Sequence, residues 1–391
     1  MRTAAIALLA FTIAAASAWF YDEGPSAEAI SWLRAGPYER DPESDLLLAR
    51  FAEQAKPFYR TKLTVDRQTE IELSVECGLV TVKCIEMLRE DRDVAASYAP
   101  QSGDYCASYE ALRDRAFFQA DPDFDTVSHN ARTIHLIKAT RFGLLREALQ
   151  TGALSADTVV GTLERQRRWS NQASFLSDRM MAAATMGIVI SATNTAMALD
   201  PKIAADTRLT TLLRDMSDGE SSLRRVLQAE SRYMQHLFET DALELPWYSR
   251  HKGQMMMNLR IRHLQDVAAH SELNDAEYWF SDPPQASSLL VGLVGYDEPY
   301  YNLYSDILRL AVYNLRAIQE AQQVHASGPA HELTSLPAPL EWAWRDAKLC
   351  ITIDPKPKGF HEVCGLTRQL SGGATPAPAG NPELLRRTEQ I

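Results

Sequence analysis

The spacing of apolar residues is that of amphipathic helices along most of the chain. Between residues 126 and 241, apolar side chains recur at steps of three and four, the period of one helix face. Capping residues, glycines and prolines divide this region, and helices are expected over 127–150, over 156–199 as one long helix or two collinear ones, from Pro201 onward, and from a capping box at 217–220 to about residue 238. Consecutive helices with short connections predict an antiparallel bundle.

Local signals set several helix ends inside and around this body. Gly152 is placed to end one helix and Ser155 to cap the next, which predicts an antiparallel hairpin. Pro246 and Gly253 are expected as breaks. Further helices are expected over 26–34, 43–54, 84–94, 104–118 (antiparallel to 84–94), 254–270, 298–323 and 340–347, with an acidic loop at 121–125.

Two stretches depart from the amphipathic pattern. Residues 180–199 carry no charge, and this length would permit a membrane span. The run contains several hydroxyl side chains and continues from a polar helix, so we expect the central helix of a bundle instead. The second stretch, 349–354, is rich in β-branched residues, and the turn at 355–359 lets 360–366 return antiparallel.

The predicted fold is therefore all-α, a multi-helix antiparallel bundle with a small C-terminal β-hairpin. The expected organisation is an N-terminal targeting segment at 1–18, a leading segment at 19–60, a helical domain at 61–330, a short helix with a hairpin at 331–370, and a flexible tail at 371–391 rich in proline and glycine.

The N-terminal residues predict export. Arg2 precedes an uncharged run at 3–21, and Ala16-Ser17-Ala18 presents the small side chains that signal peptidase accepts. If the run is cleaved after Ala18, the protein is soluble in the periplasm. If it is kept, the run is just long enough to hold the protein at the inner membrane, with Trp19, Phe20 and Tyr21 as its aromatic belt.

Export changes how the cysteines are interpreted, because thiols oxidise outside the cytoplasm. The five cysteines allow at most two internal disulfides. Cys350 and Cys364 are expected to pair across the hairpin. Cys77 is expected to pair with Cys84, with Cys84–Cys106 as the rival; a continuous helix between Cys77 and Cys84 would hold them about 10 Å apart, so that pair requires a loop.

Composition excludes few functions, and no catalytic motif is present. The net charge is −11 and the basic residues form no dense run beyond 165–168, which argues against nucleic acid as a partner. The nine histidines are scattered, and we expect neither a cofactor nor a metal site. One local concentration of tyrosines and acids at 295–306 suggests a binding site formed by Tyr296, Asp297, Tyr300 and Tyr304. The alternative is that Asp297 caps a helix on which Tyr300 and Tyr304 pack.

Three segments carry a resemblance to a known group of proteins: AWFYDEG near the start, SFLSDRMMAAA before the uncharged run, and YNLYSDILRLAVYNL late in the chain. They are similar to uncharacterised exported or membrane-anchored helical proteins of proteobacteria. The resemblance implies an exported helical domain and assigns no activity.

Together these observations predict a non-enzymatic interaction or scaffold protein of the cell envelope, with an unidentified envelope protein as its partner. Two alternatives stay open at this level. One is a periplasmic, hydrolase-like enzyme whose site is not visible in the sequence. The other is a protein that binds an apolar ligand between its helices.

Overall fold

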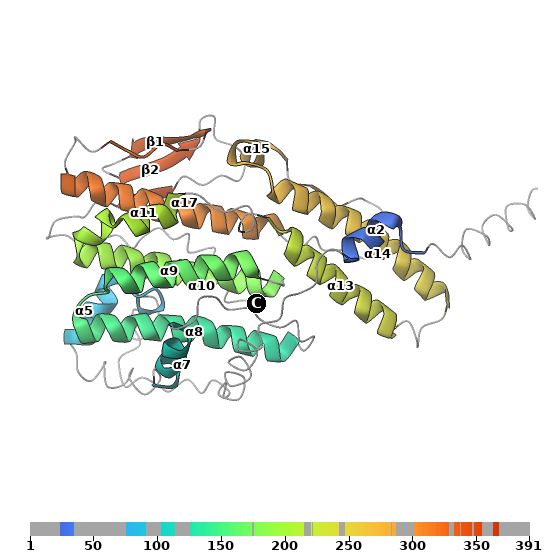
Figure 1. The fold of residues 1–391 in the computed structure, drawn as a ribbon, viewed down its shortest axis with the longest axis horizontal. Coiled ribbons are helices and arrows are strands. Elements are labelled where there is room, and N and C mark those ends of the chain that lie inside the picture. The colour runs from blue at the N-terminus through green and yellow to red at the C-terminus, as the bar shows by residue number, and fades with distance from the viewer. Residues whose placement is uncertain are drawn as a thin grey trace, which may run out of the picture. The chain divides into compact units, whose positions relative to one another are not determined.

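A computed structural model of the 391-residue chain provides the structure. It describes residues 24–34, 76–90, 103–113, 126–173, 176–214, 220, 222–241, 247–282, 284–286, 301–327, 332–336, 338–345, 348–353 and 363–366. The chain is mostly helical, with a small antiparallel sheet near its C-terminus, so the predicted fold class is confirmed (Figure 1). The targeting segment, the helix at 43–54, the loop at 121–125 and the tail at 371–391 lie outside the described residues.

The described helices span most of the chain. They are α2 (Ala27–Arg34), α5 (Val82–Glu90), α7 (Gly103–Arg113), α8 (Thr126–Thr151), α9 (Ala156–Gln172), α10 (Leu176–Leu199), the 3₁₀-helix η2 (Pro201–Ala205), α11 (Thr207–Arg214), α13 (Arg224–Asp241), α14 (Trp247–Ser271), α15 (Asp275–Phe280) and α17 (Tyr301–Ser327). The strands are β1 (Leu340–Arg345), β2 (Lys348–Ile353) and β3 (Val363–Leu366).

The chain forms two compact units. The small unit comprises residues 1–39, 222–272 and 282–302, and it contains α2, α13 and α14. The large unit comprises residues 40–221, 273–281 and 303–391, and it contains the other elements, including nearly all of α17. The domain boundaries expected from the sequence remain predictions.

Helix α10 lies at the centre of the large unit. It packs against α5, α8, α9 and η2, and α8, α9 and α10 lie side by side (Figure 1). Met186, Val189 and Met197 of α10 are buried in the main apolar cluster. Residues 182–199 are the one stretch of the described chain that is long and apolar enough to cross a membrane, and 61% of them are buried within the protein. This packing is that of the predicted core helix.

Several predicted helix boundaries are confirmed. Gly152 follows α8 with φ at 88°, a conformation that glycine adopts without a Cβ clash. The Ser155 hydroxyl accepts a hydrogen bond from the Thr158 amide at 3.1 Å and caps α9. Asp200 likewise caps the next element, which has Pro201 at its first position. That element is the five-residue 3₁₀-helix η2, and α11 follows it.

The prediction of one long or two collinear helices over 156–199 is wrong. Ala173 leaves the helical conformation (φ −52°, ψ 132°), and α10 folds back along α9. The Gln166 amide then donates to the Ala182 carbonyl, and the Arg179 guanidinium donates to the Ser170 carbonyl. The sequence has no glycine or proline at this break. Contacts between the two helices stabilise it instead.

Three further expectations are corrected by the packing. Helices α5 and α7 both pack on α8 and not as a pair with each other. Helix α13 begins at Arg224 and not at the capping box, of which only Glu220 is described. Gly253 lies inside α14, since one glycine costs a long helix only about 1 kcal/mol. The short helix α15, capped by Asn274, was not predicted.

The C-terminal sheet has the order β1-β2-β3, with both pairs antiparallel. The predicted hairpin is β2 with β3, and Cys350 lies directly opposite Cys364 in its register. Segment 340–347 was predicted to be helical, but its first six residues form β1. Leu340, Trp342 and Trp344 alternate along this strand, and Leu340 packs with β2 residues against α15 and α17.

Candidate functional site

Most of the tyrosine cluster predicted from the sequence lies outside the described residues. Tyr296, Asp297 and Tyr300 lie outside the described residues. Tyr304 lies in the first turns of α17, where only its backbone is described. The cluster therefore remains a prediction. The described residues of the large unit contain a disulfide loop and two polar arrangements.

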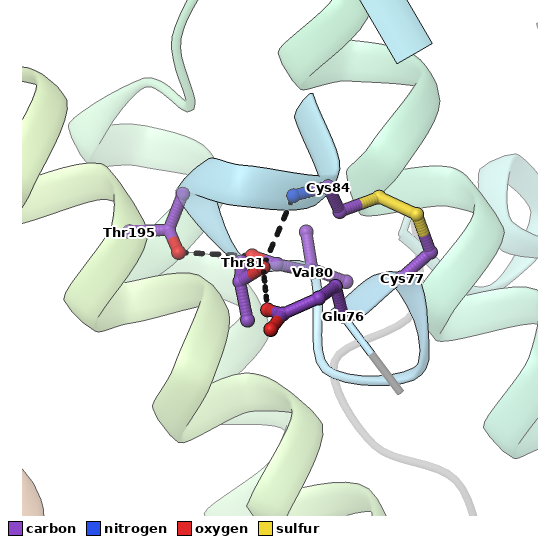
Figure 2. Close-up of a disulfide and its surroundings, with 6 residues drawn as sticks. All are labelled: Glu76, Cys77, Val80, Thr81, Cys84 and Thr195. Carbon is purple, nitrogen blue, oxygen red and sulfur yellow. Dashed lines mark hydrogen bonds between the residues drawn. A yellow bond between two sulfur atoms is a disulfide. The ribbon is translucent and has the colours of Figure 1, made fainter. Parts of the chain in front are cut away.

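The predicted disulfide between Cys77 and Cys84 is present and closes a tight loop. Cys77 and Cys84 are bonded, with their Cα atoms 5.0 Å apart (Figure 2). Thr81 caps the helix that carries Cys84: its hydroxyl accepts from the Cys84 amide at 3.1 Å and donates to Glu76 Oε2 at 2.7 Å. The loop that the pair requires is thus formed by residues that also start α5.

The disulfide loop is docked onto the core helix. Val80 is fully buried and has φ at 57°, a conformation unfavourable for a β-branched residue. Figure 2 shows Thr195 reaching from α10, where its hydroxyl donates to the Val80 carbonyl at 2.9 Å. Because both cysteines are fully buried, this disulfide stabilises the fold and is not an exposed reactive group.

The other cysteines are consistent with this pairing. Cys106 is a buried thiol on α7 that donates to the Phe142 carbonyl at 3.6 Å, so the rival Cys84–Cys106 pair is wrong. Cys350 is disulfide-bonded and lies opposite Cys364.

A polar pocket lies between α7 and α9. It has a volume of about 220 Å³ and is lined by Tyr109, Arg113, Asp157, Thr158 and Arg165. Tyr109 approaches α8 so closely that a Cβ atom on Gly143 would lie 2.0 Å from its ring. Glycine at this position therefore lets Tyr109 seat deeply, with its hydroxyl 3.3 Å from the Thr162 hydroxyl.

We call this cavity the α7/α9 pocket. Its two arginines are held by hydrogen bonds and an ion pair. Arg165 donates to the Arg113 carbonyl at 3.1 Å and to the Thr162 hydroxyl at 3.2 Å. Arg113 is the last residue of α7 and pairs with Glu110 at 3.1 Å. These contacts tie the end of α7 to α9 and fix two guanidinium groups at one site.

The remaining lining groups lie in the first turn of α9. The Thr158 hydroxyl donates to Glu147 of α8. Asp157 is 84% exposed and pairs with Arg208 at 2.7 Å.

Burial raises the pKa of Tyr109, while its hydrogen bond with Thr162 and the nearby Arg165 act in the opposite direction. The Tyr109 hydroxyl therefore stays protonated at neutral pH and can donate a hydrogen bond.

A second polar arrangement lies between α7 and α8. Ser108 Oγ and His135 Nε2 are 2.9 Å apart, and the two residues are only 4% and 3% exposed. The Tyr105 ring packs on the His135 ring, and Lys138 lies 5.8 Å above the same tyrosine. Burial lowers the pKa of Lys138 to about 8, and the neighbouring Arg141 acts in the same direction.

The sequence did not predict either arrangement. The sequence places Ser108 and Tyr109 on a predicted helix and Arg165 in the short basic run at 165–168, and neither pattern indicates a site. The one available signal for the pocket was Gly143, an isolated glycine inside a strongly helical segment, which indicates close approach of another group. Among the described residues, no cluster of histidine, cysteine or acidic side chains could hold a metal ion.

No protein family, curated protein or solved structure gives a significant match to the chain. A function must therefore be argued from the geometry of these residues.

Proposed function

We propose that this protein is a non-enzymatic interaction protein of the cell envelope and that the α7/α9 pocket is where it contacts its partner. The observation that carries this proposal is the composition of the pocket: two positioned guanidinium groups with the Tyr109 and Thr158 hydroxyls. These are groups that recognise a partner by charge and hydrogen bonds.

The proposed location is the periplasm, free or tethered to the inner membrane by residues 3–21. Two features support it. The first is the arginine followed by an uncharged run at the N-terminus. The second is the Cys77–Cys84 disulfide, since structural disulfides persist in oxidising compartments. The similarity to exported helical proteins of proteobacteria points the same way and remains a proposal.

Site-directed photo-crosslinking tests the proposed contact. A photoreactive side chain at Asp157, on the exposed rim of the pocket, should give a discrete adduct with an envelope protein. The matched control is the same side chain at Arg168, which also lies on α9 but pairs with Glu164 outside the pocket. An adduct from neither position, or equal adducts from both, would contradict the proposed contact surface.

The alternative of a hydrolase has one specific observation in its favour, the Ser108–His135 hydrogen bond. A serine beside a histidine is the core of a nucleophile and base pair. Both side chains are enclosed, so a substrate would reach them only after α7 moved from α8. A fluorophosphonate probe distinguishes the two functions: labelling of Ser108 that disappears in His135→Ala would favour the enzyme, and an unlabelled protein would count against it.

A further inference from the structure

We infer that strand β1 is a self-association surface, which pairs edge to edge and antiparallel with β1 of a second copy of this chain. The inference goes beyond the proposed function and does not depend on it, because β1 and the α7/α9 pocket share no residue. It rests on the position of β1 at the edge of the sheet, on the exposure of its side chains, and on a sequence that is complementary to itself in antiparallel pairing.

The outer side of β1 is a sheet edge. In the order β1-β2-β3, β1 pairs with β2 on one side, and within the described part of the chain no strand lies on its other side. The register with β2 runs unbroken over Leu340–Arg345, so alternate residues of β1 direct their N–H and C=O groups away from β2. The strand contains no proline, lysine or bulge, which are features that protect sheet edges from pairing. An edge of this kind is a template for another strand.

Strand β1 is also more exposed than the strand beside it. Glu341, Trp344 and Arg345 are exposed, whereas residues 349–351 of β2 are buried. Trp344 is 51% exposed, although Leu340 on the same face of the strand is only 4% exposed. Tryptophan is enriched in protein interfaces, where its large apolar ring is removed from water. A second strand paired with β1 would cover this ring.

Antiparallel pairing centred on Ala343 identifies a second copy as the occupant of this edge. In this register Ala343 faces itself, and Trp342 faces the second copy's Trp344. Glu341 faces the second copy's Arg345, and two-fold symmetry forms each unlike pair twice. Aromatic pairs and pairs of opposite charge both stabilise antiparallel strands. Arg345 also has contacts within its own chain, and the register requires only that its positive charge lies opposite Glu341.

The neighbouring registers lack this charge complementarity. Pairing centred on Trp342 sets Glu341 opposite Ala343, and pairing centred on Glu341 sets its carboxylate opposite the same carboxylate of the second copy. Pairing centred on Trp344 matches only residues 343–345 of the strand. The register about Ala343 therefore combines a long match with oppositely charged pairs.

Sedimentation velocity of the purified full-length protein, as a function of its concentration, tests the inference. A strand edge is a small interface, so we expect a weak dimer with a Kd of about 1–100 µM. Glu341→Arg should raise the Kd about tenfold or more, because the pairs of opposite charge become pairs of like charge. Glu332→Arg is the matched charge reversal at an exposed residue before β1, and it should leave the Kd within about twofold.

A mixing experiment separates the proposed register from a general effect of charge. Arg345→Glu should weaken self-association as Glu341→Arg does, because two glutamates then face each other. When these two variants are mixed in equal amounts, each arginine of one faces a glutamate of the other, so the mixture should recover the wild-type Kd within about threefold. The double variant should recover it as well, and near-UV circular dichroism reports whether each variant is folded.

Two results would overturn the inference. One is a wild-type protein that stays monomeric at about 500 µM, which would leave the edge to a strand of another protein. The other is a mixture of Glu341→Arg with Arg345→Glu that associates no better than either variant alone. If Arg345→Glu does not fold, Trp344→Ala replaces it, and the inference fails if neither Trp344→Ala nor Glu341→Arg weakens the dimer more than Glu332→Arg. None of these results bears on the α7/α9 pocket, which crosslinking tests separately.

Discussion

The two units of this protein each contain an arginine–glutamate pair with the same geometry in different surroundings. In the large unit, Arg167 binds Glu220 through two nitrogens at 2.7 and 2.6 Å. In the small unit, Arg224 binds Glu272 at the same two distances. The first pair is 11% and 7% exposed, and the second is 44% and 34% exposed. The two pairs have the same geometry and differ in burial.

Because of this difference in burial, the first pair belongs to the core of its unit and the second lies at the surface. Glu220 lies in a buried, electropositive region, where Arg167 also donates to the Leu212 carbonyl. The fully buried Arg179 also interacts electrostatically with the Glu220 carboxylate. Burial lowers the pKa of Arg179 to about 10, and the negative charge of Glu220 opposes that shift. A buried charge that loses its partner cannot be solvated, whereas an exposed one can.

The largest expected effect comes from breaking the buried pair. Glu220→Gln should lower the free energy of unfolding of the large unit by about 3–5 kcal/mol, because it removes the carboxylate that binds the largely buried Arg167. Denaturant unfolding followed by circular dichroism measures this loss. The double variant Arg167→Met with Glu220→Leu should recover most of it, and a loss below about 1 kcal/mol in the single variant would show that burial is not the deciding factor.

A second buried position tests whether packing without charge is as demanding. Gly143→Ala should lower the free energy of unfolding by about 1–3 kcal/mol or more, because its Cβ would lie 2.0 Å from the Tyr109 ring. Gly187→Ala is the matched control, since its Cβ would meet no atom within 4 Å on α10. The control should be stabilising by up to about 1 kcal/mol, and similar behaviour of the two variants would contradict the close approach of Tyr109.

The Cys77–Cys84 disulfide stabilises the large unit by a covalent crosslink, which does not depend on charge. Replacing Cys77 and Cys84 together by serine should lower the free energy of unfolding by about 2–3 kcal/mol, because the unfolded chain regains the freedom of a short loop. In contrast to the ion pairs, this loss should be unchanged by added salt, and a salt-dependent loss would argue against it.

The smallest effect is expected at the exposed pair. Glu272→Gln should cost under about 1 kcal/mol, and the cost should shrink in high salt. The hydrogen bond from Arg224 holds the pKa of Glu272 below its usual range. The pair's contribution is therefore present above the ordinary glutamate pKa and is lost as the pH falls through the lower, folded value. Acid unfolding monitored at Trp32, a small-unit residue beside Arg224, should show this dependence in the wild type and not in the variant.

Sequence reasoning succeeded where a few neighbouring residues fix the outcome. The Gly152 and Ser155 boundary, the loop between Cys77 and Cys84, and the β2–β3 hairpin were all predicted from local chemistry. It failed where distant contacts overrode local preference. The chain turns back at Ala173 without a breaker, and Leu340–Arg345 forms a strand because β2 supplies a partner for each of its residues.

The candidate pocket could not have been assembled from the sequence. Arg113 and Arg165 are 52 residues apart, and they meet only because α7 packs on α8 while α9 follows the turn at Gly152. The same is true of Ser108 with His135 and of Arg167 with Glu220. Their roles depend on burial and distance, which the spacing of residues along the chain does not express.

By itself, the sequence determined the helical fold class, several helix boundaries and one cysteine pairing, and it predicts export. These follow from periodicity, caps and turns, whose free energies are set within a few residues. The tertiary structure decided which helices fold back, which ion pair is buried, and which arginines face one pocket. The physical reason is that the register and packing of whole helices determine these contacts, and no short segment encodes that register alone.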